Sequence, residues 1–348
     1  MWRSAFAPAL ALLATPAQSA TTPPVIGYVA AFKGLDRIVD RADFSRYTHV
    51  DLAFVNPGRD GSISVGGALA CAPDGKGGVN VSPRSLRRLV EAAHRAGAKV
   101  LVSVGGGVIP ACSGDWAKLL EPQTRARIIA GLVALIDEYG FDGLDVDLEG
   151  ELMTRIDKAG NYTPFIAALS NALRARGKLL TCATASYEGG MVPDSSLPYF
   201  DLVGIMSYDA IGPTWGEPGS EHSTFAQAER DLRLWIGKGV PLDKLALGVP
   251  FYGYGFGRYR RNYAFHDVAA QFGRAARHGD VVGRLCAGCD YITYNGIETL
   301  RRKAELAGAW GAGVMVWEID QDTSDHRLIR SLRDALQKGR ARARRVAR

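Results

Sequence analysis

The chain has 348 residues, of which 47% are hydrophobic and 22% are charged, so it can bury a large core in one domain or two. Its net charge of +6 equals the six basic residues that stand without an acid in the last eleven positions. The rest of the chain is close to neutral, which argues against a nucleic-acid-binding body.

Residues 1–20 have the pattern of a secretory signal sequence. Arg3 supplies the positive start, residues 6–14 form a short apolar run, and Ala17 and Ser19 provide small residues for cleavage near Ala20. The apolar run is too short to span a bilayer, and no other apolar run in the sequence is long enough to do so. We therefore expect a secreted or periplasmic protein without a membrane span.

Apolar runs alternate with amphipathic helical patterns from residue 25 onward. We predict strands at residues 25–32, 48–55, 99–104, 141–148, 179–185, 202–207, 245–251 and 313–319. Between and after them we predict helices at residues 83–96, 123–139, 163–176, 225–237, 297–309 and 326–337. This series predicts an α/β fold in which a parallel sheet closes into a (β/α)8 barrel, as one domain over residues 21–337. An open doubly wound sheet is the alternative, but no glycine-rich dinucleotide loop follows the first strand.

Two connections, residues 56–82 and 252–295, are far longer than usual βα loops. In a barrel of this kind, the functional site lies at the carboxyl ends of the strands. These loops are therefore candidate walls of a substrate site, with surface decoration as the alternative.

The five cysteines suggest two disulfides in an exported protein. Cys71 and Cys112 fall in loops after strands, and Cys286 and Cys289 form a close pair in a glycine-rich loop. The close pair is also half of a possible zinc site, but no second pair accompanies it. Cys182 lies inside an apolar strand and is most simply a core residue.

The fourth predicted strand carries three acids. Asp145, Asp147 and Glu149 stand two residues apart, so in an extended strand they share one face, while the intervening leucines and valine share the other. Like charges this close cannot all ionise, so at least one pKa should be raised. The pattern indicates acid–base chemistry, with a calcium or magnesium site or an exposed strand face as alternatives.

The last eleven residues are predicted to form a basic, disordered and solvated tail, residues 338–348, with weak binding to anionic surfaces as an alternative. Its charges are Lys338, Arg340, Arg342, Arg344, Arg345 and Arg348.

Several motifs together resemble glycoside hydrolase family 18, which comprises chitinases and related endo-β-N-acetylglucosaminidases. The D-G-x-D-x-D-x-E run ends at Glu149, S-V-G-G occupies residues 103–106, and M-S-Y-D occupies residues 206–209. Residues 247–253 and 316–319 resemble the family's seventh and eighth strands, and the resemblance extends from Gly27 to about Leu336. Two departures stand out. The α+β insertion after the seventh strand should be reduced or absent, and Gly150 replaces the usual aromatic residue after the glutamate.

The resemblance implies a substrate-assisted mechanism that retains configuration and needs no metal or cofactor. Glu149 would be the general acid, and Asp147 would bind the N-acetamido group of the substrate and stabilise the oxazolinium ion. Asp145 would hold Asp147 and tune its pKa, and Tyr208 would orient the amide. Trp317 would form an apolar floor beneath the sugar.

The wider predicted sugar-binding set has varying support. Tyr208 and Trp317 could instead be core residues. Packing inside the barrel explains the strand aromatics Tyr28, Phe54 and Tyr252 nearly as well as contact with a sugar does. Trp116 and Trp215 are equally plausible as sugar platforms and as loop anchors. We assign no role to His49, His222 or His266. The substrate-binding set is Trp317, Asp209, Met206, Tyr28, Phe54 and Tyr252.

The first functional hypothesis is hydrolysis of β-1,4-linked N-acetylglucosamine polymers by a monomeric enzyme. An endo-β-N-acetylglucosaminidase acting on N-glycans or wall glycans is the alternative within enzymes. A non-catalytic chitin-binding lectin is the alternative of another class, but lectins of this kind usually lack the acid at the Glu149 position. The partner in each case is an N-acetylglucosamine-containing glycan, with no nucleic acid.

Overall fold

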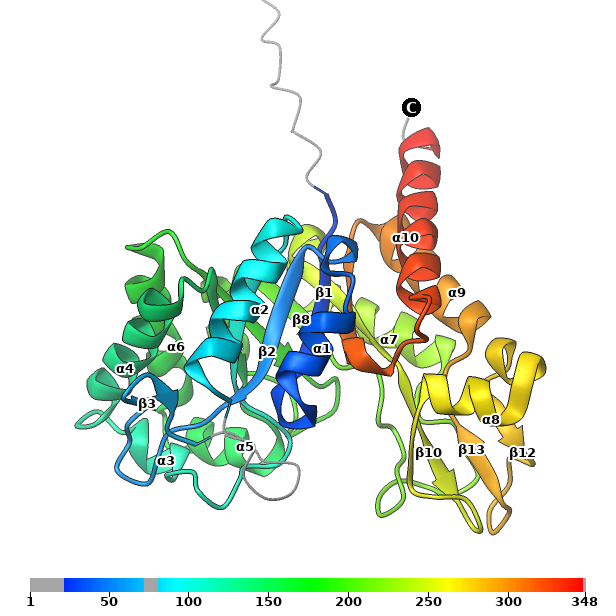
Figure 1. Ribbon diagram of the computed structural model, residues 1–348, viewed down its shortest axis with the longest axis horizontal. Helices are drawn as coiled ribbons and strands as arrows, with labels where there is room; N and C mark the ends of the chain where they lie inside the picture. Colours follow the sequence, from blue (N-terminus) through cyan, green and yellow to red (C-terminus); the bar gives the residue numbers. More distant parts are fainter. Residues whose placement is uncertain (1–21, 72–80, 347–348) are drawn as a thin grey trace, which may run out of the picture.

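The computed structural model describes residues 22–71 and 81–346, and eight parallel strands within them close into a barrel (Figure 1). The predicted signal sequence lies outside the described residues. Around the barrel the strand order is β1-β14-β9-β8-β7-β6-β5-β2. The strands are β1 (Val25–Ala30), β2 (His49–Val55), β5 (Lys99–Gly105), β6 (Gly143–Asp147), β7 (Leu179–Thr184), β8 (Leu202–Ile205), β9 (Leu245–Pro250) and β14 (Gly313–Trp317). All eight predicted strands are present, and the barrel prediction is confirmed.

Helices surround the barrel, and the six predicted ones are all found. They are α2 (Pro83–Arg95), α4 (Arg125–Tyr139), α6 (Tyr162–Arg174), α7 (Phe225–Gly237), α9 (Ile297–Trp310) and α10 (Arg327–Val346). Three shorter helices are α1 (Leu35–Arg41), which precedes α2, and α3 (Trp116–Leu119) and α5 (Gly150–Lys158), which flank α4 in the chain. Local signals explain their bounds. The Ser82 side chain caps α2 just before Pro83, and α4 ends where Gly140 takes a positive φ of 72°.

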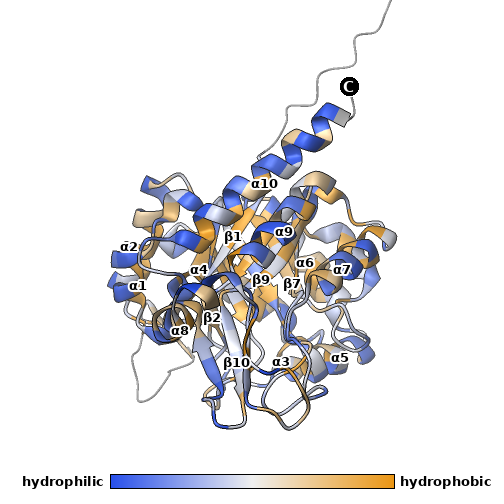
Figure 2. Cartoon of the chain, turned by 90° about the vertical axis from the view of Figure 1, so that its right-hand side faces the viewer, coloured by the Kyte–Doolittle hydropathy of each residue, from blue (hydrophilic) through white to orange (hydrophobic). Residues whose placement is uncertain are grey.

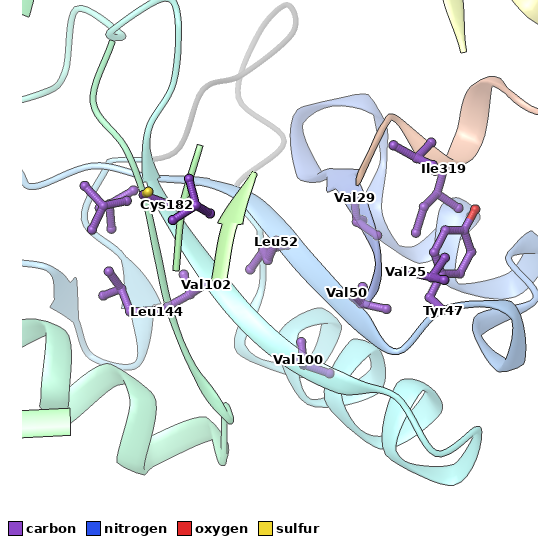
Figure 3. Packing of buried hydrophobic residues seen from close by; sticks show 14 of the residues in the cluster. Val25, Val29, Tyr47, Val50, Leu52, Val100, Val102, Leu144, Cys182 and Ile319 are labelled. Atoms are coloured by element: carbon purple, nitrogen blue, oxygen red, sulfur yellow. The ribbon is translucent and has the colours of Figure 1, made fainter. Parts of the chain in front are cut away.

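The core has two layers because strand side chains alternate in direction. Outward-facing apolar residues of neighbouring strands, such as Val100, Val102 and Leu144, pack beneath the helices (Figure 3). A smaller cluster inside the barrel contains Tyr28 and Phe54. Figure 2 shows the apolar strands enclosed by helices whose outer faces are largely polar.

A compact α+β insertion follows β9. It contains β10 (Tyr252–Phe256), β11 (Asn262–Ala264), α8 (Phe265–His278), β12 (Val281–Gly283) and β13 (Tyr291–Thr293). The strands form an antiparallel sheet in the order β11-β10-β13-β12, which projects beside the barrel (Figure 1). Of the two expectations, a reduced or an absent module, the structure therefore excludes the absent one. The other long loop forms a hairpin of β3 (Ser64–Val65) and β4 (Ala68–Leu69) before residues 72–80, which lie outside the described residues.

The prediction of a disordered tail is wrong for residues 338–346, which continue helix α10. Gly308 of α9 and Gly339 of α10 let the two helices approach so closely that a side chain at either position would collide with the opposite backbone. Lys338 Nζ also lies 3.7 Å from a carboxylate oxygen of Glu305 on α9. Packing against α9 thus stabilises the helical conformation of this basic segment. No helix in residues 22–71 or 81–346 is long and apolar enough to cross a membrane.

The disulfide prediction is confirmed in both pairs. Cys71 is bonded to Cys112, and Cys286 is bonded to Cys289. Cys182 is free and buried in the core beside β6 and β8, as its apolar strand predicts. The first bond ties the loop after β2 to the loop after β5, at the end of the barrel where the acids lie.

Candidate active site

A cleft of about 870 Å³ opens at the carboxyl ends of the strands, where the predicted site residues gather. Asp147 ends β6, Trp317 ends β14, and Asp209 follows β8. Nine of the ten predicted site residues line this cleft; the tenth, Asp145, is buried beneath it. The nine are Tyr28, Phe54, Asp147, Glu149, Met206, Tyr208, Asp209, Tyr252 and Trp317.

The acids of β6 face the barrel interior, as the alternation predicts. Asp145 is 1% exposed and accepts three hydrogen bonds. Tyr28 Oη and Ser103 Oγ donate to its Oδ2 at 2.8 and 2.7 Å, and Thr181 Oγ1 donates to its Oδ1 at 2.7 Å. Burial raises the pKa of Asp145, while these three hydrogen bonds act in the opposite direction. Four strands therefore hold this carboxylate rigidly beneath Asp147.

Asp147 and Glu149 lie together above Asp145. Burial raises the pKa of Asp147 well above its ordinary value, and the charges of Glu149 and Asp145 raise it further. Burial also raises the pKa of Glu149, to about 7, although a side-chain hydrogen bond with Asp147 acts in the opposite direction. The pair thus retains a proton near neutral pH, in a cleft where a substrate can reach it. Glu149 lies two residues beyond the end of β6, immediately before α5, rather than on the strand itself.

Sequence reasoning missed another buried acid beside Asp145, which is Asp51 on β2. It is 1% exposed, and burial followed by the charge of Asp145 raises its pKa well above the ordinary value. The signal was available in the sequence H-V-D-L-A-F-V of β2, where a single acid stands among the apolar residues 50–55.

Aromatic rings form part of the lining of the cleft that contains Glu149. The ring of Trp317 lies 5.5 Å from that of Phe54, at an interplanar angle of 16°, and 5.4 Å from that of Tyr28. Met206 and Tyr208 pack against the same cluster. These rings leave an apolar surface beside the acids, which suits the C–H face of a sugar.

Asp209 and Tyr252 form another part of the lining of the cleft. Asp209 has a φ of 60°, and its Oδ1 accepts a hydrogen bond of 2.5 Å from Tyr252 Oη. Buried His222, to which the sequence assigned no role, places Nδ1 3.6 Å from the same oxygen. Tyr254 was also missed; its ring packs edge-on against that of Tyr252. Only the insertion brings these tyrosines to Asp209.

A second cavity of about 670 Å³ adjoins the cleft and shares Glu149, Met206, Tyr208 and Asp209 with it. Trp215 lines this cavity and is 45% exposed. Trp116, in contrast, is 1% exposed and donates from Nε1 to Asn56 Oδ1 at 2.8 Å, so it is a loop anchor.

The structure also shows where His49 and His266 lie, and it bears on the alternative of a metal site. His49 begins β2 at the opposite end of the barrel, and His266 lines the cleft. Within the described part of the chain, no three His, Cys, Asp or Glu side chains are grouped so as to hold a metal ion.

The chain matches the family described as Glycosyl hydrolases family 18 over residues 24–322. It is 25% identical to a probable chitinase 10 of Drosophila melanogaster over 318 residues, which cover 74% of this chain but 14% of that protein. A chitinase-like effector of Moniliophthora roreri is 26% identical over 245 residues, covering 63% of this chain and 55% of the effector.

Among solved structures, a family 18 chitinase from the chitin utilization locus of Flavobacterium johnsoniae superposes with a TM-score of 0.75 at 28% identity. The alignment covers 90% of this chain and 94% of that one. The chain thus spans most of this bacterial chitinase, but less than two thirds of the two curated relatives.

Proposed function

Because the chain belongs to glycosyl hydrolase family 18, we propose that it hydrolyses β-1,4-linked N-acetylglucosamine polymers by substrate-assisted, retaining catalysis. The observation that carries the proposal is the pair of acids in the cleft, with Asp147 at the end of β6 and Glu149 two residues beyond it. The pKa of Glu149, raised to about 7, is suited to a general acid near neutral pH.

In the proposed reaction, Glu149 donates its proton to the glycosidic oxygen as the bond to the leaving sugar breaks. The acetamido oxygen of the substrate attacks the anomeric carbon and forms an oxazolinium ion. Asp147, which lies above Asp145, binds the amide N–H and stabilises the positive charge. Glu149, now ionised, removes a proton from water, which opens the ring with retained configuration.

The two adjoining cavities, both lined by Glu149, support a substrate that continues past the cleaved bond. We propose that the sugar bearing the reacting acetamido group sits on Trp317, with Tyr28 and Phe54 behind the indole. The remaining predicted contacts, Met206, Tyr208, Asp209 and Tyr252, line the wall that this sugar would meet. The second cavity, with Trp215 at its edge, would receive the leaving sugars.

We also propose that the protein is exported. Two disulfides fit an oxidising compartment, and residues 1–20 have the composition of a signal sequence.

Substrate comparison tests the function. The purified protein is incubated with chitin oligomers, cellulose oligomers and fully deacetylated chitosan of equal length, with a glycoprotein in parallel. We expect cleavage of the chitin oligomers only, because the other two polymers lack the amide that acts as nucleophile, and we expect the loss in kcat as well as in KM. Comparable rates on all three polymers would refute substrate-assisted catalysis.

Two other outcomes would favour the alternatives. Release of N-glycans from the glycoprotein without cleavage of chitin would identify an endo-β-N-acetylglucosaminidase. Binding of chitin without turnover by the unaltered protein would identify a lectin.

A further inference from the structure

Lys303 is a fully buried lysine that the proposed mechanism does not use. It lies on α9, outside the cleft, and its side chain is 0% exposed. Its Nζ donates to the Ser223 carbonyl oxygen at 2.9 Å, to Ser223 Oγ at 2.7 Å and to Asn295 Oδ1 at 2.7 Å. All three acceptors are neutral, so the ammonium group is held by hydrogen bonds rather than by an ion pair.

These bonds join segments that are far apart in the chain. Ser223 lies in the loop between β8 and α7, and Asn295 lies between the insertion and α9. Asn295 Nδ2 also donates to the Ser223 carbonyl oxygen at 2.7 Å, and the His222 backbone N–H donates to Thr293 Oγ1 of β13 at 3.1 Å. The lysine therefore lies where the insertion is attached to the barrel.

The same network reaches the turn that carries Tyr208 and Asp209. Ser223 Oγ accepts from Lys303 and donates to the carbonyl oxygen of Ser207 at 2.7 Å, one residue before Tyr208. The Ala210 N–H, one residue after Asp209, donates to the carbonyl oxygen of His222 at 3.0 Å. Both ends of the two-residue turn are thus bonded to the segment that Lys303 holds.

We propose that Lys303 is a positioning residue which, through Ser223, fixes the turn bearing Tyr208 and Asp209 against the tyrosine wall of the insertion. The turn requires such support because Asp209 has a left-handed φ of 60°, which is uncommon for a residue other than glycine. The catalytic consequence rests on the proposed function, in which these two side chains meet the reacting sugar. The position of the turn itself does not depend on the proposed function.

Lysine is suited to this position because only its ammonium group offers three donors at the end of a long, flexible stem. Burial lowers the pKa of Lys303 to about 7, while Asp280, Glu221 and Asp231 act in the opposite direction. Removing the ammonium would leave buried acceptors without their donor, which is more disruptive than removing both partners of a bond.

The kinetic test compares Ser223→Ala with a matched control, Ser170→Ala. Both serines are fully buried and both donate from Oγ to a backbone carbonyl, but Ser170 on α6 bonds to Tyr199, away from the cleft. We expect Ser223→Ala to lower kcat on a chitin oligomer by about tenfold to a hundredfold with little change in KM, because misplaced groups act mainly on the reacting geometry. We expect Ser170→Ala to leave kcat unchanged.

Lys303→Met, which keeps much of the length of the side chain, completes a double-mutant cycle. If Lys303 acts through Ser223, the double variant loses no more kcat than the worse single variant. Fully additive losses would overturn the proposal, as would normal kcat in folded Ser223→Ala. If Lys303→Met fails to fold, the kcat of Ser223→Ala remains as the kinetic test of the proposal.

A readout without substrate separates this proposal from the proposed function. Trp215 Nε1 donates to the Asp209 carbonyl oxygen at 3.0 Å, so its indole reports on the turn. In protein labelled with 5-fluorotryptophan, the fluorine resonance of Trp215 is assigned by its loss in Trp215→Phe. We expect it to shift or broaden in Ser223→Ala and not in Ser170→Ala. An unmoved resonance would overturn the positioning role even in an active enzyme, whereas a moved resonance in a protein without chitinase activity would overturn only the proposed function.

Discussion

Replacing Glu149 with glutamine should stabilise the fold above neutral pH while removing turnover. The pKa of Glu149 is about 7 in the folded chain, against an ordinary value of 4.5. The folded chain therefore binds more protons than the unfolded chain between these values, so ionisation of Glu149 makes the fold less stable as pH rises from 4.5 to 7. Glutamine keeps the shape of the side chain but does not ionise, so the variant should not undergo this loss.

The size of the effect follows from the pKa difference. At about 1.4 kcal/mol per pKa unit, a rise from 4.5 to about 7 corresponds to about 3 kcal/mol when the group is fully ionised. Glu149 is partly open to the cleft, where solvent weakens the effect of burial, so we expect a net gain of about 1–2 kcal/mol at pH 8. At roughly 2–4 °C per kcal/mol for a large domain, Tm should rise by about 2–8 °C. At pH 4 the gain should disappear, because the glutamate is then mostly protonated in both states.

Calorimetric melting of the two proteins at pH 4, 6 and 8 measures this difference. Glu151→Gln is the matched control, since it makes the same chemical change on an exposed residue of the adjoining helix. Hydrolysis of a chitin oligomer is measured alongside, and we expect a loss of about 10²–10⁴-fold for Glu149→Gln alone. A Tm difference that does not grow with pH would refute the pKa argument, and near-normal turnover would refute the general-acid assignment.

Three further predictions follow from the same geometry. The kcat/KM of the unaltered enzyme should fall as pH rises through about 7, because the free enzyme then loses the Glu149 proton; a profile that stays flat to pH 9 would contradict this. Exhaustive chelation should leave the rate unchanged, and a lost rate restored by calcium or magnesium would favour the metal alternative. Tyr252→Phe removes the 2.5 Å hydrogen bond to Asp209 and should lower kcat/KM by about tenfold or more, with folding checked by circular dichroism; an unchanged kcat/KM would show that this bond does not orient the site.

Much of the barrel and of the acid array could be predicted because both depend on local patterns. Repeated apolar runs and amphipathic helices predict a parallel barrel, and the two-residue spacing of Asp145 and Asp147 places them on the inner face of a strand. The family motifs then predicted Tyr208 and Trp317 at strand ends, and the structure brings both to the cleft. The pairing of Cys71 with Cys112 was predictable for a similar reason, since both lie in loops at one end of the barrel.

The remaining features depend on contacts between segments far apart in the chain. From the sequence, Trp116 and Trp215 are equally plausible as sugar platforms. Only their packing shows that Trp116 is a buried anchor and that Trp215 is exposed. The charges of residues 338–346 predicted a disordered tail, yet Gly308 and Gly339 let these residues continue helix α10 along α9.

The sequence by itself determined which strand carries the acids and which of its faces they occupy, because side-chain alternation is a property of each strand alone. Only the tertiary structure decided which neighbours surround those acids and the turn beside them. Lys303 stands 80 residues from Ser223, and His222 meets Tyr252 only because the insertion folds back onto the barrel. Such contacts depend on barrel closure, and no local pattern specifies them.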